Sequence, residues 1–149
     1  MQQSSELFFV SSNENKFQET ERILSNFGMQ INFFKTTLEE IQSNNLNDIA
    51  EQKAVNAYEI VKKPMIIEDD GLFIDSLNGF PGPYSSYVYD TIGNKGIMNL
   101  LENCETRDAK FVSIIAYCDS DCDVKLFESS IPGKISSIIE KGGWGYDPI

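Results

Sequence analysis

The chain has 149 residues, of which 41% are hydrophobic, carries a formal net charge of −11 and contains no histidine. Its length and hydrophobic content predict one globular domain with a core of its own. The acidic balance argues against a protein that binds nucleic acid or anionic lipid, because both need a basic face. Without histidine, the sequence excludes a Ser-His-Asp triad and histidine-ligated zinc, so acid–base chemistry falls mainly to carboxylates, lysines or tyrosines.

The cysteines and the N-terminus give no sign of secretion or of a membrane anchor. Cys104, Cys118 and Cys122 fit neither a disulfide framework nor a four-cysteine zinc site, so we interpret them as reduced thiols of a cytoplasmic protein. The N-terminal residues have no basic stretch, and no segment of the sequence approaches 18 consecutive apolar residues. We therefore expect neither a signal peptide nor a membrane span.

Strands and helices alternate in the first half of the chain. The predicted order is strand 6–10, helix 14–28, strand 29–34, a polar loop, a helix from about 47 to 63, and strand 65–67. Apolar residues at helical spacing support the first helix, and Pro64 limits the second.

Consecutive strands dominate the second half. The predicted order is an extended segment 71–77, a rigid turn 78–83, short helices 85–93 and 94–104, and antiparallel strands 109–118 and 124–140 joined by a hairpin at 119–123. Residues 141–149 predict neither helix nor strand. Alternating elements followed by consecutive strands indicate an α/β fold with a mixed sheet.

The first chemical signal is the segment between the first strand and the first helix. Ser11, Ser12, Asn13 and Asn15 are small donors placed where free backbone N–H groups favour an anion such as phosphate. Lys16 follows in the first helical turn, where the helix dipole disfavours a cation unless an anion lies between them. The alternative is an ordinary helix N-cap with a solvated lysine, and both interpretations stay open at this point.

The second signal is a cluster of three adjacent acids, Glu68, Asp69 and Asp70, at the end of an apolar strand. Side chains alternate along a strand, so Glu68 and Asp70 share one face and Asp69 takes the other. Carboxylates that open into a cleft are natural Mg²⁺ ligands, and one of them could take a proton from an attacking water. Glu39 and Glu40, in the preceding loop, could complete such a site, although on their own a solvated pair of acids is the favoured alternative. A strand end whose acids turn to water is less favoured, because three adjacent acids repel one another without a cation.

The third signal is the C-terminal stretch GGWGYDPI. Glycines leave room beside an aromatic ring, so Trp144 could stack on a nucleobase, and Asp147 could accept a hydrogen bond from a base N–H. On these residues alone, a glycine-rich turn with a core aromatic is the favoured alternative.

Four segments together resemble the Ham1/inosine triphosphatase family, in its order and spacing. They are SSNENK at 11–16, LEEIQ at 38–42, IIEDDGLFIDSLNGFPGPYS at 66–85 and GGWGYDPI at 142–149. The family consists of nucleoside triphosphate pyrophosphatases that act on non-standard purine nucleotides, and the LEEIQ form is nearest its archaeal and eukaryotic branch. The resemblance covers essentially the whole chain. It implies an elongated mixed sheet with flanking helices, in two lobes around a central cleft, and a homodimer.

The resemblance also implies a role for each matching residue. Glu40 and Asp69 would ligate Mg²⁺, Asp69 would accept a proton from the attacking water, and Glu68 would be a supporting acid. Residues 11–16 would bind the triphosphate, with Asn13 and Lys16 as principal contacts. The implied substrate-binding residues are Ser11, Ser12, Asn13, Glu14, Asn15, Lys16, Asp70, Trp144, Gly145, Tyr146 and Asp147. The implied reaction hydrolyses ITP, dITP or XTP to the monophosphate and pyrophosphate, which cleans the nucleotide pool.

Three departures from the family pattern leave alternatives open. Ser12 stands where the family commonly has glycine, and Asp70 where it commonly has serine or threonine. The family also continues with a strand, a lysine and a Ser-His-Arg motif, whereas this sequence ends at Ile149, so we expect the C-terminal part of the family fold to be missing. The alternatives are a Maf-like pyrophosphatase of modified pyrimidine nucleotides and a catalytically silent module that binds nucleotide or metal.

Overall fold

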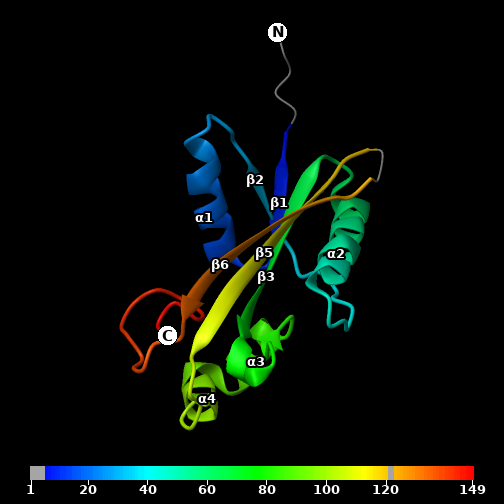
Figure 1. Cartoon of the computed structure of the whole chain (residues 1–149). Helices are drawn as coiled ribbons and strands as arrows, with labels where there is room; N and C mark the ends of the chain where they lie inside the picture. The colour runs from blue at the N-terminus through cyan, green and yellow to red at the C-terminus, as the bar shows by residue number, and fades with distance from the viewer. Residues whose placement is uncertain (1–5, 121–122) are drawn as a thin grey trace. The chain divides into compact units, whose positions relative to one another are not determined.

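A computed structural model describes residues 6–120 and 123–149 of the chain (Figure 1). Within these residues, six strands form one mixed sheet in the order β2-β1-β3-β5-β6, with β4 paired to β3. The strands are β1 (Phe8–Ser11), β2 (Asn32–Lys35), β3 (Met65–Ile74), β4 (Pro81–Gly82), β5 (Asp108–Cys118) and β6 (Lys125–Lys134). The helices are α1 (Glu14–Ser25), α2 (Leu46–Val61), α3 (Ser85–Thr91), α4 (Gly93–Leu100) and the 3-10 turn η1 (Asp75–Leu77). The predicted α/β class with a mixed sheet is confirmed.

The chain divides into two compact units. Unit 1 comprises Met1–Asp69 and Ile114–Phe127, and unit 2 comprises Asp70–Ser113 and Glu128–Ile149. Cys122 and part of the predicted hairpin at 119–123 lie outside the described residues. No helix in the described part of the chain is long and apolar enough to cross a membrane.

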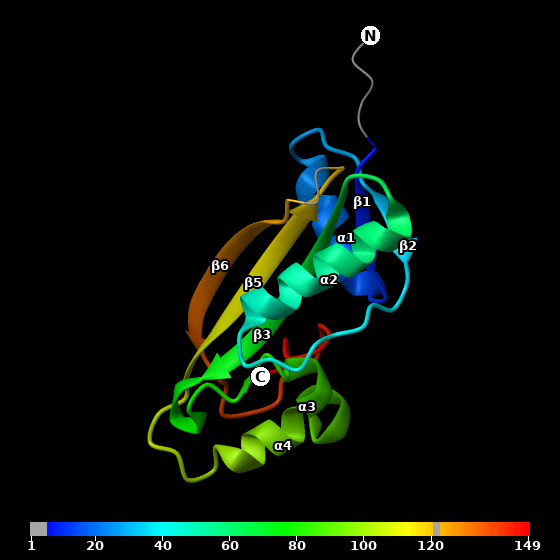
Figure 2. The same ribbon diagram turned by 90° about the vertical axis from the view of Figure 1, so that its right-hand side faces the viewer.

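In unit 1, α1 and α2 lie on opposite faces of the sheet (Figures 1 and 2). Strand β1 pairs in parallel with both β2 and β3, and Phe8 is opposite Asn32 on one side and Met65 on the other. Because side chains alternate along a strand, one face supplies apolar contacts to α1. The core on that face contains buried Phe9, Ile31 and Ile66, with Leu7, Phe17, Leu24, Phe33, Ile115 and Tyr117 packed against them.

In unit 2, a second core gathers side chains from β3, α3, α4 and the C-terminal residues. Its buried members are Leu72, Ile74, Val88, Ile97, Leu101, Ala109, Ile135 and Tyr146. Strand β4 pairs antiparallel with β3, with Gly82 opposite Leu72. A Cβ atom on Gly71 would lie 2.7 Å from the carbonyl oxygen of Gly82. Glycine is therefore required at 71, because a side chain there would push β4 away from β3.

Several predicted boundaries differ from the structure, and two of the differences bear on the site and the core. The acids Glu68–Asp70 were expected at the end of a strand, but β3 continues through them to Ile74. The strand continues because β1 pairs with it before the acids and β4 pairs with it after them. The last strand was expected to reach residue 140 but ends at Lys134. Beyond that residue, the buried side chain of Ile135 joins the core of unit 2, and its backbone amide donates to the carbonyl oxygen of Arg107.

Candidate active site

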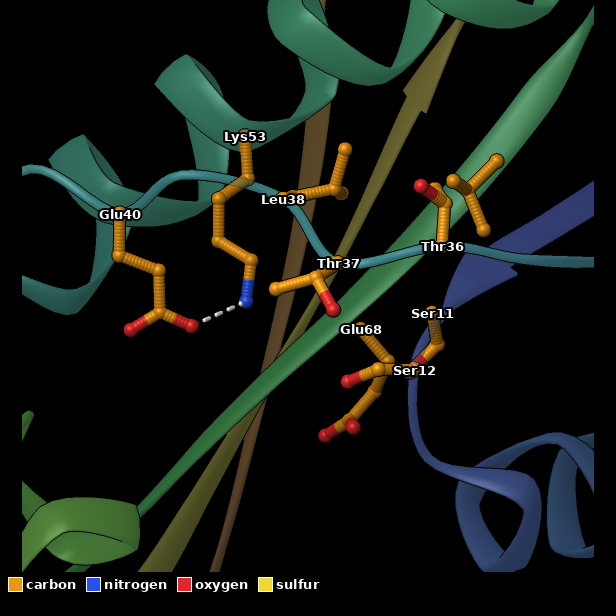
Figure 3. A pocket seen from close by; sticks show the side chains of 9 residues that line it. Ser11, Ser12, Thr36, Thr37, Leu38, Glu40, Lys53 and Glu68 are labelled. Carbon is orange, nitrogen blue, oxygen red and sulfur yellow. Dashed lines mark hydrogen bonds and ion pairs between the residues drawn. The ribbon is translucent and has the colours of Figure 1, made fainter.

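A pocket opens in unit 1 where the chain leaves the parallel strands β1 and β2 (Figure 3). Its lining residues are Val10, Ser11, Ser12, Thr36, Thr37, Leu38, Glu40, Lys53 and Glu68. In sheets of this kind, ligands bind outside the carboxyl ends of the parallel strands. The lining combines hydroxyl donors, one lysine and two carboxylates, which suits a charged ligand rather than an apolar one.

The ammonium group of Lys53 joins two of the acids selected from the sequence. Its Nζ lies 2.8 Å from Oε1 of Glu40 and 3.1 Å from Oδ2 of Asp69. Figure 3 shows the Lys53 side chain extending from α2 with its nitrogen directed towards the carboxylate of Glu40. The lysine and the aspartate are largely buried, with 13% and 12% of their side chains exposed, whereas Glu40 is 53% exposed. Glu40 and Asp69 are thus within reach of one common cation.

Lys53 was not among the residues predicted for the site, although the sequence held a signal for it. In α2, buried Ala50, Ala54 and Ala57 form an apolar stripe, and Lys53 lies three residues after the first and four before the last. Residues three and four apart share one helix face. A lysine beside a buried alanine stripe therefore needs a polar partner, which here is the pair Glu40 and Asp69.

Burial and attraction between opposite charges both act on the pKa values of Lys53 and Asp69. Burial would lower the pKa of Lys53, but attraction to Asp69 and Glu40 outweighs it, and the pKa of Lys53 is raised. Burial raises the pKa of Asp69 above the ordinary value of an aspartate, although Lys53 and Lys16 pull it down. Asp69 is thus a more basic carboxylate than an exposed one, which suits a proton acceptor.

A second ion pair lies beside the pocket. Nζ of Lys16, in the first turn of α1, lies 2.8 Å from Oε2 of Glu68, with 17% and 11% of the side chains exposed. The sequence argument required an anion to offset a cation at a helix N-terminus. In this structure Glu68 supplies that anion.

The loop before α1 has the geometry of an N-cap. Oδ1 of Asn13 accepts hydrogen bonds from the backbone amides of Asn15 and Lys16, at 2.9 and 3.3 Å. Oγ of Ser11 accepts from the amide of Asn13. Glu14 is exposed and pairs with Lys35 at 2.6 Å, which holds the pKa of Glu14 below its usual range. Within the predicted loop, the structure therefore places Ser11 and Ser12 in the pocket lining and Glu14 in an exposed ion pair.

The remaining predicted residues belong to unit 2. Tyr146 is buried and donates from its hydroxyl to the carbonyl oxygen of Ser85 at 2.7 Å, while Nδ2 of Asn94 donates to the carbonyl oxygen of Gly145 at 2.9 Å. Trp144 is half-buried, and its amide donates to Oδ2 of Asp147 at 3.0 Å. These bonds hold the segment 144–147 in one conformation, with Tyr146 directed into the core.

Glycine is needed at position 143 for this conformation. Its φ is +72°, and a Cβ atom would lie 2.4 Å from Cβ of Asp147. Asp70, at the start of unit 2, is half-buried on β3, and its charge contributes to the raised pKa of Tyr146.

Comparison with known proteins gives the same assignment as the motifs. The chain is 42% identical over 144 residues to a dITP/XTP pyrophosphatase of Methanopyrus kandleri, an alignment that covers 96% of this chain and 77% of that protein. It is 40% identical to the dITP/XTP pyrophosphatase of Korarchaeum cryptofilum, with coverage of 96% and 77%. The solved structure of a HAM1 protein from Coxiella burnetii matches with a TM-score of 0.80 and 27% identity, and covers 97% of this chain and 80% of that one. The family model described as the Ham1 family matches residues 7–149. The chain therefore belongs to the Ham1 family.

Proposed function

We propose that this chain is a nucleoside triphosphate pyrophosphohydrolase that cleaves dITP, XTP and ITP between the α- and β-phosphates. The observation that carries the proposal is the convergence of Glu40, Lys53 and Asp69, beside a hydroxyl-lined pocket and the Lys16–Glu68 pair. The dITP/XTP pyrophosphatases that are 40–42% identical to the chain support the same reaction.

The donor set fits a magnesium ion. Glu40 and Asp69 present hard carboxylate oxygens to one cationic group. No cluster of three or more Asp, Glu or Cys side chains suited to a metal exists within residues 6–120 and 123–149. Two carboxylates are enough, because Mg²⁺ usually keeps several waters and binds through one or two carboxylates plus substrate phosphates. When bound, the ion would neutralise phosphate charge and polarise the phosphoryl oxygens.

The protein's own residues supply the other parts of the proposed reaction. Lys16 and Lys53 carry the positive charge that a triphosphate requires in a chain with a net charge of −11. The hydroxyl groups of Ser11 and Ser12 offer further donors to phosphate oxygens. Asp69 accepts a proton from the water that attacks the α-phosphate, and its burial favours that role.

We assign recognition of the base to the C-terminal segment of unit 2. The half-buried ring of Trp144 offers a stacking surface for a purine, and the carboxylate of Asp147 offers an acceptor for a base N–H. Tyr146 supports both residues from the core, because its side chain is buried and its hydroxyl is bonded to Ser85. We further propose that the protein works as a cytoplasmic homodimer.

The test is release of pyrophosphate, measured with Mg²⁺ and a panel of ITP, XTP, dITP, ATP, GTP and UTP. We expect rapid turnover of the first three and slow turnover of the others. Preference for UTP would favour a Maf-like pyrophosphatase, and binding of ITP without pyrophosphate release would favour a silent binding module. Light scattering on a size-exclusion column tests the dimer, since a protein of monomer mass contradicts it.

A further inference from the structure

The two carboxylates that we assign to the metal ion already share a cation. One ammonium group, Nζ of Lys53, contacts Oε1 of Glu40 at 2.8 Å and Oδ2 of Asp69 at 3.1 Å. These are oxygen atoms of the two side chains that would coordinate Mg²⁺. Because the Lys53 side chain is 13% exposed, water and salt screen its charge poorly. A divalent ion at Glu40 and Asp69 must therefore displace the ammonium group or lie against it.

From this geometry we propose that Lys53 competes with the divalent cation for Glu40 and Asp69, so that the nucleotide-free protein binds the metal weakly. The inference rests on the proposed function only for the assignment of those two carboxylates to the metal.

A triphosphate would relieve the competition. Lysine is a compact charge on a flexible four-carbon stem, so Lys53 can exchange one set of oxygen partners for another without movement of α2. Under the proposed function, the hydroxyl-lined pocket that Lys53 also borders would hold phosphate oxygens. With Lys53 engaged by phosphate, its two carboxylates are available to the metal ion. Nucleotide then raises the affinity of the protein for the metal ion, and the metal ion raises its affinity for nucleotide. Without nucleotide, little metal is bound.

The other lysine of the site has a different place. Lys16 pairs with Glu68, and its charge adds to the attraction that Asp69 experiences. Among the ion pairs of the described residues, Lys53 is thus the lysine that joins the two carboxylates assigned to the metal.

The experiment measures binding of Mn²⁺ to the full chain in the absence of nucleotide, by electron paramagnetic resonance of the free ion. Mn²⁺ is the probe because it takes the same oxygen ligands as Mg²⁺. Three proteins are compared: wild type, Lys53→Met and Lys63→Met. Lys63 pairs with exposed Glu6 at 2.7 Å. Lys63→Met therefore changes the net charge by the same amount as Lys53→Met, but outside the pair Glu40 and Asp69.

Couplings between binding events are commonly 5- to 150-fold, so we expect Lys53→Met to bind Mn²⁺ roughly tenfold more tightly than wild type. Lys63→Met should match wild type. Adding Glu40→Gln to Lys53→Met should remove the gain, which places the ion at this pair. Equal binding of Mn²⁺ by wild type and Lys53→Met would overturn the competition but leave the metal assignment standing. Absence of binding in both would overturn the competition and the metal assignment together, whatever the turnover assay shows.

Loss of Lys53 also leaves the largely buried carboxylate of Asp69 without this cation, which would destabilise the fold of the methionine variant. Lys53→Gln covers that case, because it retains a hydrogen-bond donor to the carboxylates and still removes the charge. For this variant, Mn²⁺ should raise the unfolding temperature by more than it does for wild type. An equal or smaller rise in Lys53→Gln would contradict the proposal.

Discussion

The ammonium group of Lys16 lies 2.8 Å from Oε2 of Glu68, and both side chains are largely buried. The contact explains how a lysine is accommodated in the first turn of α1, where the helix dipole disfavours a positive charge. It also keeps a cation beside the proposed phosphate site in the absence of substrate. One ion pair thus has a structural role and, under the proposed function, a role in binding.

Lys16→Met separates these two roles. Loss of a charged contact to phosphate should lower kcat/KM for ITP by about 10- to 100-fold, since hydrogen bonds to charged groups contribute about 1.5–3 kcal/mol. The unfolding free energy should fall by about 2 kcal/mol, because the largely buried Glu68 carboxylate loses a bonding partner. The double variant Lys16→Met/Glu68→Met should recover stability but not activity, as judged by urea unfolding and pyrophosphate release. Recovery of activity in the double variant would show that Lys16 only balances Glu68.

The order of the elements was predictable because it depends on local patterns. Apolar residues at helical spacing and the position of Pro64 placed α1 and α2 nearly correctly. The extent of β3 was not predictable from its own residues, since Glu68–Asp70 read as a strand end. Those acids remain in the strand because β1 and β4 pair with it on either side of them, and such pairing between distant segments leaves no local trace.

The sequence singled out residues with an unusual chemistry, whereas contacts that depend on packing are visible only in the structure. Three adjacent acids were identified because their repulsion needs an explanation. Lys53 was missed because its role depends on the path of the loop that carries Glu40, which has no periodic pattern. A contact of Tyr146 to the base stays a prediction, and the structure adds that its side chain lies in the core of unit 2 and donates to the carbonyl oxygen of Ser85. Only the folded chain distinguishes a buried aromatic from an exposed one in a glycine-rich segment.

Asp69→Asn tests the proposed proton acceptor. A general base contributes about 10²- to 10⁴-fold, so we expect kcat to fall by about 1,000-fold with the fold intact by circular dichroism. The matched control is Asp70→Ser, which removes the neighbouring charge and introduces a residue type that the family commonly has there. Asp70→Ser should retain turnover within about tenfold. This variant still has Asp69, so it keeps the general-base contribution of about 10²-fold or more. If Asp69→Asn stays active, or if the two variants lose activity equally, Asp69 is not the acceptor.

Ser85→Ala tests the polar contact that joins β3 to the turn at β4. The buried hydroxyl of Ser85 accepts from the amide of Leu72 at 2.8 Å and donates to the carbonyl oxygen of Gly82 at 2.6 Å. Alanine would leave both backbone groups unsatisfied in the core, so the unfolding free energy should fall by about 2–3 kcal/mol. The control is Ser86→Ala, one residue on and exposed, which should change stability by less than about 0.5 kcal/mol. Equal unfolding midpoints in urea for the two variants would contradict this account.

Tyr146→Phe tests the anchor of the C-terminal segment through its dependence on pH. Burial, followed by the nearby charge of Asp90, raises the pKa of Tyr146 to about 12 from the ordinary value of 10.0. The folded protein thus holds this proton more tightly than the unfolded chain does. The stability contribution is complete below pH 10 and is lost as the pH rises towards 12.

At pH 8, Tyr146→Phe should reduce the unfolding free energy by about 1 kcal/mol, through loss of the hydrogen bond to Ser85. Between pH 9.5 and 11.5 the difference from wild type should shrink or reverse, by about 1–2 kcal/mol, because phenylalanine has no proton to lose. Urea unfolding at a series of pH values measures both effects, and tyrosinate absorbance near 295 nm should show one fewer late-titrating group in the variant. The exposed Tyr87 provides the control, since Tyr87→Phe should follow the wild-type curve throughout. If the two variants follow the same curve, the Tyr146 hydroxyl does not anchor the segment and the orientation of Trp144 must have another origin.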